Sequence, residues 1–249
     1  MTGPVINLPA LNVLVVDDSA FNRRSIAEIL EACPEINVVG KAADGEEALR
    51  LATALRPDII TLDLEMPKMD GFTFMRLLMA SRPTPVVVIS SHAAKEQVFR
   101  ALELGAIDFI AKPDASAHGE LPVGPPAEPL RRELDRVLEM VRQLSPAGVR
   151  TRAVVRAHAS QPAGTRPRPE PQTTAPNRVI AVAASTGGPT ALMELFAALP
   201  PTGRGALMVA QHMPERFTRT FAERLDKQGS FRVREADHLN ELLAQSALI

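Results

Sequence analysis

The chain has 249 residues, of which 45% are hydrophobic, and this is enough to bury a core in each of two domains. Its 28 basic and 29 acidic residues leave a formal net charge of -1, so no overall field draws the chain to nucleic acid or to an anionic membrane. Cys33 is the single cysteine, which excludes an internal disulfide, and we expect a cytoplasmic protein. No apolar run approaches the roughly 20 residues that a spanning helix needs, so we expect no direct membrane insertion.

Short β-rich segments alternate with helical segments over residues 11–111, which is typical of βαβ units on a parallel sheet. We predict strands at Asn12–Val16, Asn37–Lys41, Ile59–Leu62, Val86–Ser90 and Asp108–Ile110. Apolar residues at helical spacing predict helices that cover this sheet, around Ile26–Leu30, Ala48–Leu55 and Val98–Leu102. The N-terminal part is therefore expected to be an α/β domain with a five-stranded parallel sheet.

A connection between two domains is expected after Lys112. Glu128–Leu144 carries apolar residues along one face and predicts an amphipathic connecting helix. Residues 145–177 are rich in Pro, Ala, Arg and Thr without apolar periodicity, which is typical of a flexible linker. We therefore place a first domain at residues 1–127, the connecting helix and linker at 128–177, and a second domain at 178–249.

The second domain repeats the α/β alternation. Strands are predicted at Arg178–Ala183, Ala206–Ala210 and Phe231–Glu235, with helices at Pro189–Ala198 and Phe217–Lys227. This order predicts a second, smaller parallel sheet.

Acidic side chains end two strands of the first predicted sheet: Asp17 and Asp18 follow the first strand, and Asp63 follows the third. Ligands of an open parallel sheet bind at the carboxyl ends of its strands, so we expect these carboxylates to converge. Three carboxylates at one spot repel each other unless they share a cation, and Mg2+ is a cation that favours such oxygen ligands. Asp63 is then predicted to be a nucleophile toward a phosphoryl group.

Two further polar residues lie at the same edge. Ser90 ends the fourth strand and Lys112 follows the fifth, where a hydroxyl and an ammonium group can each contact a phosphate oxygen. Taken singly, any of these residues is better explained as a solvated loop residue or a helix cap. Their combination at four strand ends indicates a phosphate site with a metal. Phe109 is either a core aromatic or a ring that changes position with Ser90.

These residues closely resemble the receiver family of two-component response regulators. The resemblance lies in Val15–Ser19, Leu62–Pro67, Met69–Gly71, Ser90, Gly105–Phe109 and Lys112-Pro113. It implies a flavodoxin-like receiver in which a histidine kinase phosphorylates Asp63. It also implies that Asp17, Asp18 and Asp63 bind Mg2+ together with the backbone carbonyl of Glu65. By the same resemblance, Ser90, Phe109 and Lys112 form the switch.

A serine and a histidine occupy corresponding places in the second predicted sheet. Ser185 lies in a tight turn before a helix, whose first amide groups can stabilise an oxyanion. His212 ends the next strand, and a right-handed crossover brings both residues to one sheet edge, where His212 can act as a base for Ser185. Each has a plainer interpretation: a helix cap or phosphate-binding turn for Ser185, and an ordinary strand-end histidine for His212.

The second segment resembles the CheB family, the chemotaxis response regulators that are protein-glutamate methylesterases. The resemblance rests on Ala184–Pro189, Gln211–Pro214 and Phe217–Leu225. It implies an incomplete, Rossmann-like methylesterase domain in which Ser185, Thr186 and His212 hydrolyse glutamate methyl esters, and in related members deamidate glutamines, without a cofactor for ester hydrolysis. The implied control is the phosphorylated receiver, and the implied partners are a chemotaxis histidine kinase and methyl-accepting chemoreceptors.

The third residue of that family's catalytic triad, an aspartate in a Met-Gly-x-Asp-Gly loop, has no counterpart in this sequence. We expect the resemblance to end near Ala236 and Asp237–Ile249 to depart from it, leaving a truncated domain with an unpaired sheet edge. Asp226, Glu235 and Asp237 are the carboxylates that remain. An alternative hypothesis is therefore a non-catalytic phosphoacceptor regulator or phosphate sink. A DNA-binding regulator is disfavoured, because no basic helix-turn-helix pattern follows the linker.

Overall fold

The computed structural model describes residues 10–90, 95–112, 128–144, 173–200, 203–238 and 240–249. Contacts divide the chain into two compact units, one of residues 1–93 and 104–155 and the other of residues 94–103 and 156–249. Within the described residues, no helix combines the length and the apolar character needed to cross a membrane.

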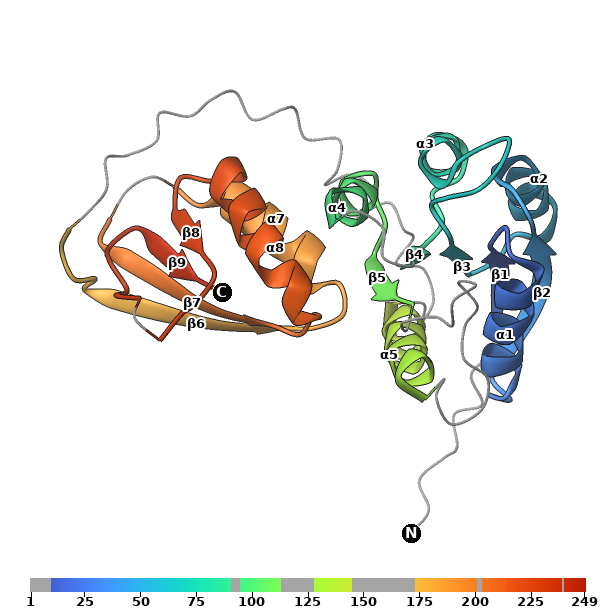
Figure 1. Ribbon diagram of the computed structural model, residues 1–249, viewed down its shortest axis with the longest axis horizontal. Coiled ribbons are helices and arrows are strands. Elements are labelled where there is room, and N and C mark those ends of the chain that lie inside the picture. The colour runs from blue at the N-terminus through green and yellow to red at the C-terminus, as the bar shows by residue number, and fades with distance from the viewer. Residues whose placement is uncertain (1–9, 91–94, 113–127, 145–172, 201–202, 239) are drawn as a thin grey trace, which may run out of the picture. The chain divides into compact units, whose positions relative to one another are not determined.

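The first unit is built on a five-stranded parallel sheet in the order β2-β1-β3-β4-β5 (Figure 1). Its strands are β1 (Leu11–Val16), β2 (Ile36–Ala42), β3 (Ile59–Leu62), β4 (Val86–Ser90) and β5 (Asp108–Ala111). These bounds agree with the predicted strands to within a residue at each end. The strand order reverses beside β1, so the carboxyl ends of β1 and β3 lie next to each other at a crevice where ligands of such sheets bind.

Helices cover both faces of this sheet, with α1 (Ala20–Glu31) and α5 (Glu128–Leu144) on one and α2 (Gly45–Leu55) and α3 (Gly71–Ser81) on the other (Figure 1). Side chains of Ser19, Asp44 and Asp70 cap α1, α2 and α3 by accepting hydrogen bonds from the first helical turn. The predicted helices do not include α3, although it buries Phe72, Phe74, Met75 and Leu78.

The helix predicted to connect the domains instead belongs to the first core. Five apolar residues of α5 are at most 4% exposed and join the cluster formed by α1 and the sheet: Leu130, Leu134, Val137, Leu138 and Val141. The amphipathic pattern predicts the helix correctly, but one apolar stripe does not say which core it covers. The helix predicted at Glu128–Leu144 is present as α5, and residues 145–172 of the predicted linker lie outside the described residues.

Replacing Leu134 with alanine is expected to lower the free energy of unfolding of the first unit by about 2 to 5 kcal/mol, because the 2% exposed side chain would leave a cavity. Hydrogen exchange of peptides from β1 and β3, measured by mass spectrometry, gives this difference. Arg131→Ala on the exposed face of α5 is the control. Equal exchange in the two variants would show that α5 does not pack in this core.

The helix α4 (Lys95–Glu103) follows β4 in sequence, and its contacts group it with the second unit. There the Phe99 ring stacks on Phe221 with 5.5 Å between centroids and meets Phe217 edge to face at 6.5 Å. The predicted first domain, residues 1–127, includes this helix.

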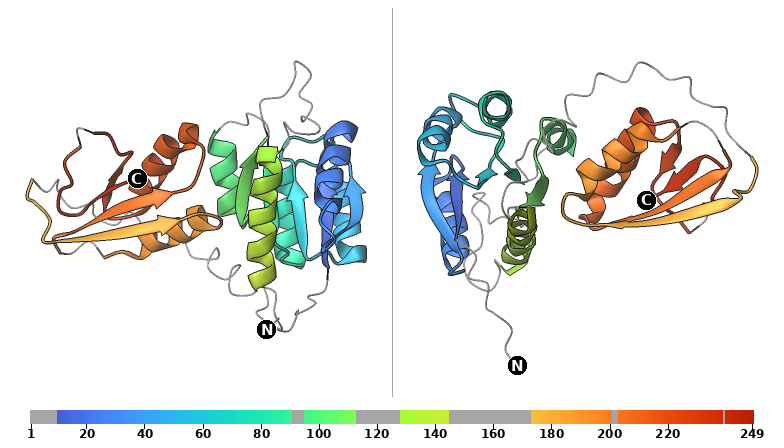
Figure 2. Two further views of the ribbon diagram at one scale, coloured as in Figure 1. Left: turned by 90° about the horizontal axis from the view of Figure 1, so that it is seen from below. Right: turned by 180° about the vertical axis from the view of Figure 1, so that it is seen from behind.

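The second unit contains a parallel sheet in the order β6-β7-β9-β8, with α7 (Gly188–Ala198) and α8 (Glu215–Gln228) on one face (Figure 2). Its strands are β6 (Arg178–Ala184), β7 (Gly205–Gln211), β8 (Arg232–Arg234) and β9 (Ser246–Leu248). No described helix of this unit covers the opposite face, where Val179 and Met208 are about half exposed.

The strand β9 is absent from the prediction, which ends the sheet at β8. In the structure β9 pairs with both β7 and β8, so the last residues of the chain fill the interior of the sheet. Ala247 at its centre is fully buried. A three-residue strand with one small apolar side chain at its centre is too short to show strand periodicity, so only the pairing reveals it.

Candidate functional site

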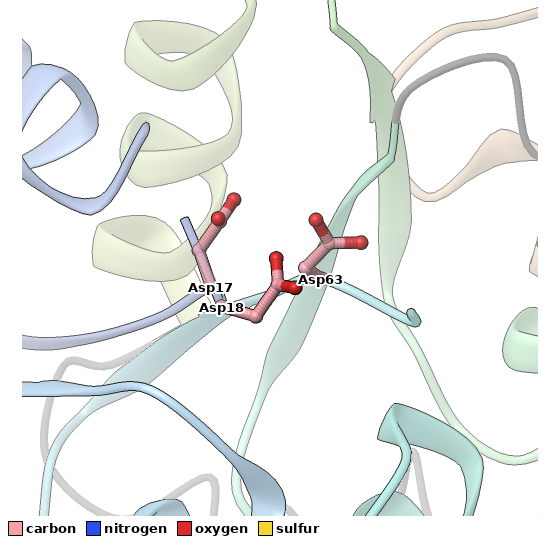
Figure 3. A group of neighbouring side chains, drawn as sticks. All are labelled: Asp17, Asp18 and Asp63. Carbon is pink, nitrogen blue, oxygen red and sulfur yellow. The ribbon is translucent and has the colours of Figure 1, made fainter. Parts of the chain in front are cut away.

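The three predicted acidic residues lie together at the carboxyl ends of β1 and β3 (Figure 3). Carboxylate oxygens of Asp17, Asp18 and Asp63 all lie within 4.8 Å of one another. Asp17 and Asp63 are buried, whereas Asp18 is exposed. The prediction that the sheet brings these residues together is confirmed, and their set of hard oxygen donors suits a divalent cation.

The loop after β1 is held by hydrogen bonds from Ser19 within it and from Arg23 of α1. The Ser19 amide donates to Asp17 Oδ1 at 2.9 Å, which fixes that carboxylate at the start of α1. Arg23 Nη1 donates to the backbone oxygens of Asp17 and Asp18 at 2.6 and 2.8 Å. The sequence pattern did not single out Arg23, because a helical arginine is usually a solvated surface residue and only the fold shows which carbonyls it reaches.

Lys112 reaches into the acidic site from the end of β5. Its Nζ donates to Asp17 Oδ2 at 2.7 Å and to Asp63 Oδ2, and its side chain is only 4% exposed. Burial raises the pKa of Asp17 to about 6; the Lys112 ammonium opposes this change, and the Asp63 carboxylate adds to it. Burial alone would lower the pKa of Lys112, but the two carboxylates outweigh it, so its pKa is raised. The Lys112 ammonium is therefore a buried positive charge in direct contact with Asp63, the predicted nucleophile.

The remaining predicted switch residues lie on the neighbouring strands. Ser90 is the last residue of β4 and pairs with Ala111 of β5, one residue before Lys112. Phe109 is partly buried in β5 opposite Val88. The structure describes the backbone of Ser90 but not its side chain. Glu65 is exposed, and its amide donates to Asp63 Oδ1 at 3.3 Å, so the loop after β3 turns back toward the acidic site.

The predicted serine and histidine emerge from adjacent strands of the second sheet. Ala184 at the end of β6 pairs with Gln211 at the end of β7, and the His212 amide donates to Ala184 O at 2.9 Å. Ser185 and His212 are both exposed at this edge. Gly187 follows with φ 73°, in the left-handed region that glycine adopts without strain, and the helix α7 begins at Gly188. The strand-end placement predicted for this pair is thus observed.

Gln211 lies at this edge and within the Gln211–Pro214 segment of the family resemblance, but no role was predicted for its side chain. Its side-chain Nε2 donates to the backbone oxygens of Ser185 and His212, each at 2.9 Å. A Cβ atom on Gly188 would overlap Gln211 Oε1, so a larger residue where α7 begins would displace the Gln211 side chain. The Gln211 side chain therefore ties the turn of Ser185 to that of His212. A glutamine beside a histidine has no distinctive sequence signal for such a role.

The carboxylates considered as replacements for a triad aspartate have other partners. Asp226 Oδ1 accepts a hydrogen bond from the Val233 amide at 2.8 Å, which joins α8 to β8. Glu235 accepts one from the Thr218 hydroxyl. Asp237 Oδ1 lies 2.6 Å from Nδ1 of the neighbouring His238. These interactions give each carboxylate a structural role within its own neighbourhood.

Two protein families match the chain. Residues 13–119 match the response regulator receiver domain, and residues 180–249 match CheB methylesterase. Protein-glutamate methylesterase/protein-glutamine glutaminase 3 of Geobacter sulfurreducens is 44% identical over 96% of this chain and 67% of its own length. The protein of the same name numbered 1 in Myxococcus xanthus is 47% identical over 91% of this chain and 60% of its own length. The chain thus spans about two thirds or less of the length of these relatives.

A solved structure is also similar to the first part of the chain. The response regulator domain of Thermotoga maritima CheB is 37% identical, covers 55% of this chain and 99% of its own, and gives a TM-score of 0.48.

The family matches correct one expectation from the sequence. The match to the CheB methylesterase family runs to residue 249, so Asp237–Ile249 does follow the family. These residues contain the strand β9, whose pairing with β7 and β8 explains why the segment is part of the domain.

Proposed function

The chain belongs to the family of chemotaxis protein-glutamate methylesterases that carry a response regulator receiver, and from this premise we propose that a phosphoryl group on Asp63 controls ester hydrolysis at Ser185. The observation that carries the first half is the buried Lys112 ammonium, which contacts Asp63 and Asp17 at the end of the sheet. The observation that carries the second half is the placement of Ser185 and His212 on adjacent strand ends.

The acidic site fits Mg2+. Asp17, Asp18 and Asp63 would hold the ion with their carboxylates, and Glu65 would add its backbone carbonyl, which makes a set of oxygen ligands only. When bound, the ion neutralises negative charge that develops on a transferring phosphoryl group. Burial raises the pKa of Asp17 and so disfavours its charged form, an effect that a bound divalent cation would offset.

The phosphoryl step uses residues of the first unit. A carboxylate oxygen of Asp63 forms a bond to phosphorus while the bond from phosphorus to the donor breaks, giving an acyl phosphate. Lys112 already contacts Asp63 and is placed to pair with a phosphate oxygen on it. Ser90 at the end of β4 would donate its hydroxyl to another phosphate oxygen, and Phe109 on the adjoining strand would change position with Ser90.

The ester step uses residues of the second unit. The Ser185 hydroxyl attacks the carbonyl carbon of a glutamate methyl ester, and His212 takes the hydroxyl proton and returns it to the departing methanol. The Thr186 amide would stabilise the oxyanion, because the Gly188 amide at the start of α7 already donates to Ser185 O at 2.8 Å and Pro189 has no N–H group. Water then releases the glutamate side chain from Ser185. The same attack on a glutamine side chain releases ammonia.

The partners that suit these two sites are a histidine kinase of the chemotaxis system, which supplies the phosphoryl group, and methylated chemoreceptors, which supply the ester. A second candidate function is a non-catalytic phosphoacceptor that competes for kinase phosphoryl groups. The hydrogen bonds that Asp226 accepts from the Val233 amide and Glu235 from the Thr218 hydroxyl favour it, because they give these two carboxylates other roles, and a serine triad needs a carboxylate to orient its histidine.

Methanol release from methyl-labelled receptor membranes decides between these functions. We expect the chain to release methanol and Ser185→Ala to reduce this to background, because Ser185 supplies the attacking hydroxyl in the proposed step. Thr190→Ala, in the buried part of α7, is the control for a general loss of the helix. No release by the wild-type chain, with normal phosphoryl uptake, would contradict the esterase and favour the phosphoacceptor.

A further inference from the structure

The loop between β3 and α3, residues 64–70, directly follows Asp63 and includes Glu65. We call these seven residues the Asp63 loop. The loop is closed at its base, where the Gly71 amide donates to Leu64 O at 3.0 Å. Its far side is attached to the start of α2, because the Gly45 amide donates to Met69 O at 3.1 Å. The loop is therefore held against a second element of the first unit.

An ion pair reinforces this attachment. Lys68 Nζ donates to Asp44 Oδ2 at 2.7 Å, and the other oxygen of Asp44 accepts from the Glu47 amide at 2.9 Å. The Asp44 side chain is only 7% exposed, while that of Lys68 is 64% exposed. The hydrogen bond from Lys68, with that from the Glu47 amide, holds the pKa of Asp44 below its usual value. Both oxygens of one buried carboxylate are thus fixed, one by α2 and one by the loop.

The backbone of Lys68 indicates that its side chain matters. Lys68 has φ 63°, in the left-handed region where glycine or asparagine is the residue without strain. A lysine in this conformation has a higher backbone energy than a glycine would have. Unlike glycine, lysine supplies an ammonium group, and this group reaches Asp44. The residue that takes this strained backbone conformation is thus the one whose side chain reaches the start of α2.

Close backbone packing leaves the loop little freedom at either end. A Cβ atom on Gly45 would lie 2.7 Å from Met69 O, and one on Gly71 would lie 2.6 Å from Asp63 O. The contact at Gly71 is with the backbone carbonyl of Asp63, the residue that carries the proposed nucleophile. A shift of the loop at Lys68 or Met69 would therefore be transmitted through a few residues to Glu65 and Asp63.

We propose that Asp44 and Lys68 are a positioning pair that fixes the Asp63 loop, and with it the Glu65 carbonyl and the Asp63 carboxylate, in the geometry that the cation requires. The inference rests on the proposed function of the acidic site. Neither residue touches the reacting atoms, and both act through the loop. Groups that orient metal ligands in this way typically change metal affinity by about 10- to 100-fold when they are removed.

The alternative is an ordinary surface ion pair, which contributes little beyond the helix cap. Stability alone does not separate the two roles, because both predict a small change in unfolding. Metal affinity does, because a surface pair has no effect on the carbonyl of Glu65. The test is therefore the Mg2+ dissociation constant of the full chain, measured by calorimetry, together with the rate of phosphoryl uptake from acetyl phosphate as a function of Mg2+.

Lys68→Met removes the ammonium and keeps the Asp44 cap, and we expect it to raise the Mg2+ dissociation constant by roughly 10-fold. The uptake rate should fall at low Mg2+ and recover at saturating Mg2+. Lys68→Arg should restore both values to within about 2-fold, because the guanidinium also pairs with a carboxylate. Lys41→Met is the matched control, since Lys41 pairs with Glu31 on the surface of the same unit at 3.9 Å.

An unchanged dissociation constant in Lys68→Met would overturn the proposal, as would equal losses in Lys68→Met and Lys41→Met. A wild-type chain that binds Mg2+ without taking up a phosphoryl group would instead overturn the proposed function, and the calorimetric comparison of the two variants would still decide the role of the pair. A wild-type chain that binds no Mg2+ would overturn both.

Discussion

Replacing Asp63 with asparagine is expected to abolish phosphoryl uptake from acetyl phosphate. The amide keeps the shape of the side chain but is not a nucleophile, so the acyl phosphate cannot form. Lys112 would keep Asp17 as its carboxylate partner, so the buried ammonium group would remain paired and the unit should still fold. Uptake is measured by the slower migration of the phosphorylated chain in a phosphate-binding gel, and folding by circular dichroism.

The control for this variant lies at the opposite end of the same strand. Asp58 Oδ2 accepts a hydrogen bond from the Asn12 amide at 2.8 Å, and Asp58→Asn should keep both this acceptor and normal uptake. Uptake by Asp63→Asn at the wild-type rate would contradict Asp63 as the phosphoryl acceptor. It would mean that another carboxylate of the cluster, Asp17 or Asp18, is the nucleophile.

Replacing Ala247 with glutamate is expected to unfold the second unit. Ala247 is fully buried in β9 and pairs with Leu207 of β7 and Val233 of β8, so the charge would lie in the interior of the sheet. An unpaired buried charge belongs to the changes that cost more than about 4 kcal/mol, a large fraction of the stability of a small domain. Hydrogen exchange in β7 and α8 should rise sharply, while phosphoryl uptake by the first unit persists.

Ala183→Glu is the matched substitution, since Ala183 is an exposed alanine in β6 of the same sheet. It should leave exchange in β7 and α8 close to that of the wild type. Similar exchange in Ala247→Glu and Ala183→Glu would mean that β9 does not occupy the interior of the sheet, and the pairing of the last residues of the chain would be wrong.

The acidic site is the feature that the sequence predicts best, and the reason is topological. Once β-rich and helical segments alternate, a parallel sheet follows, and residues placed after successive strands must meet at one edge. Asp17, Asp63 and Lys112 are separated by dozens of residues, yet each directly follows a strand. The same argument places Ser185 and His212 on adjacent strand ends.

The parts that the sequence does not predict depend on pairing between distant segments. The apolar stripe of α5 identifies a helix, but its packing in the first core depends on residues more than a hundred positions away. The strand β9 consists of Ser246–Leu248, and only its two neighbours define it. Side-chain roles such as that of Gln211 or Lys68 depend on which backbone oxygen or carboxylate the fold brings within reach.

The central claim is that phosphorylation of Asp63 controls ester hydrolysis at Ser185. The most direct test measures methanol release by the wild type and by Asp63→Asn, with and without acetyl phosphate. The account predicts that acetyl phosphate and Mg2+ raise the release rate of the wild type and leave that of Asp63→Asn unchanged. An equal rise in both chains would contradict control through Asp63, and an unchanged rate in the wild type would contradict control by phosphorylation.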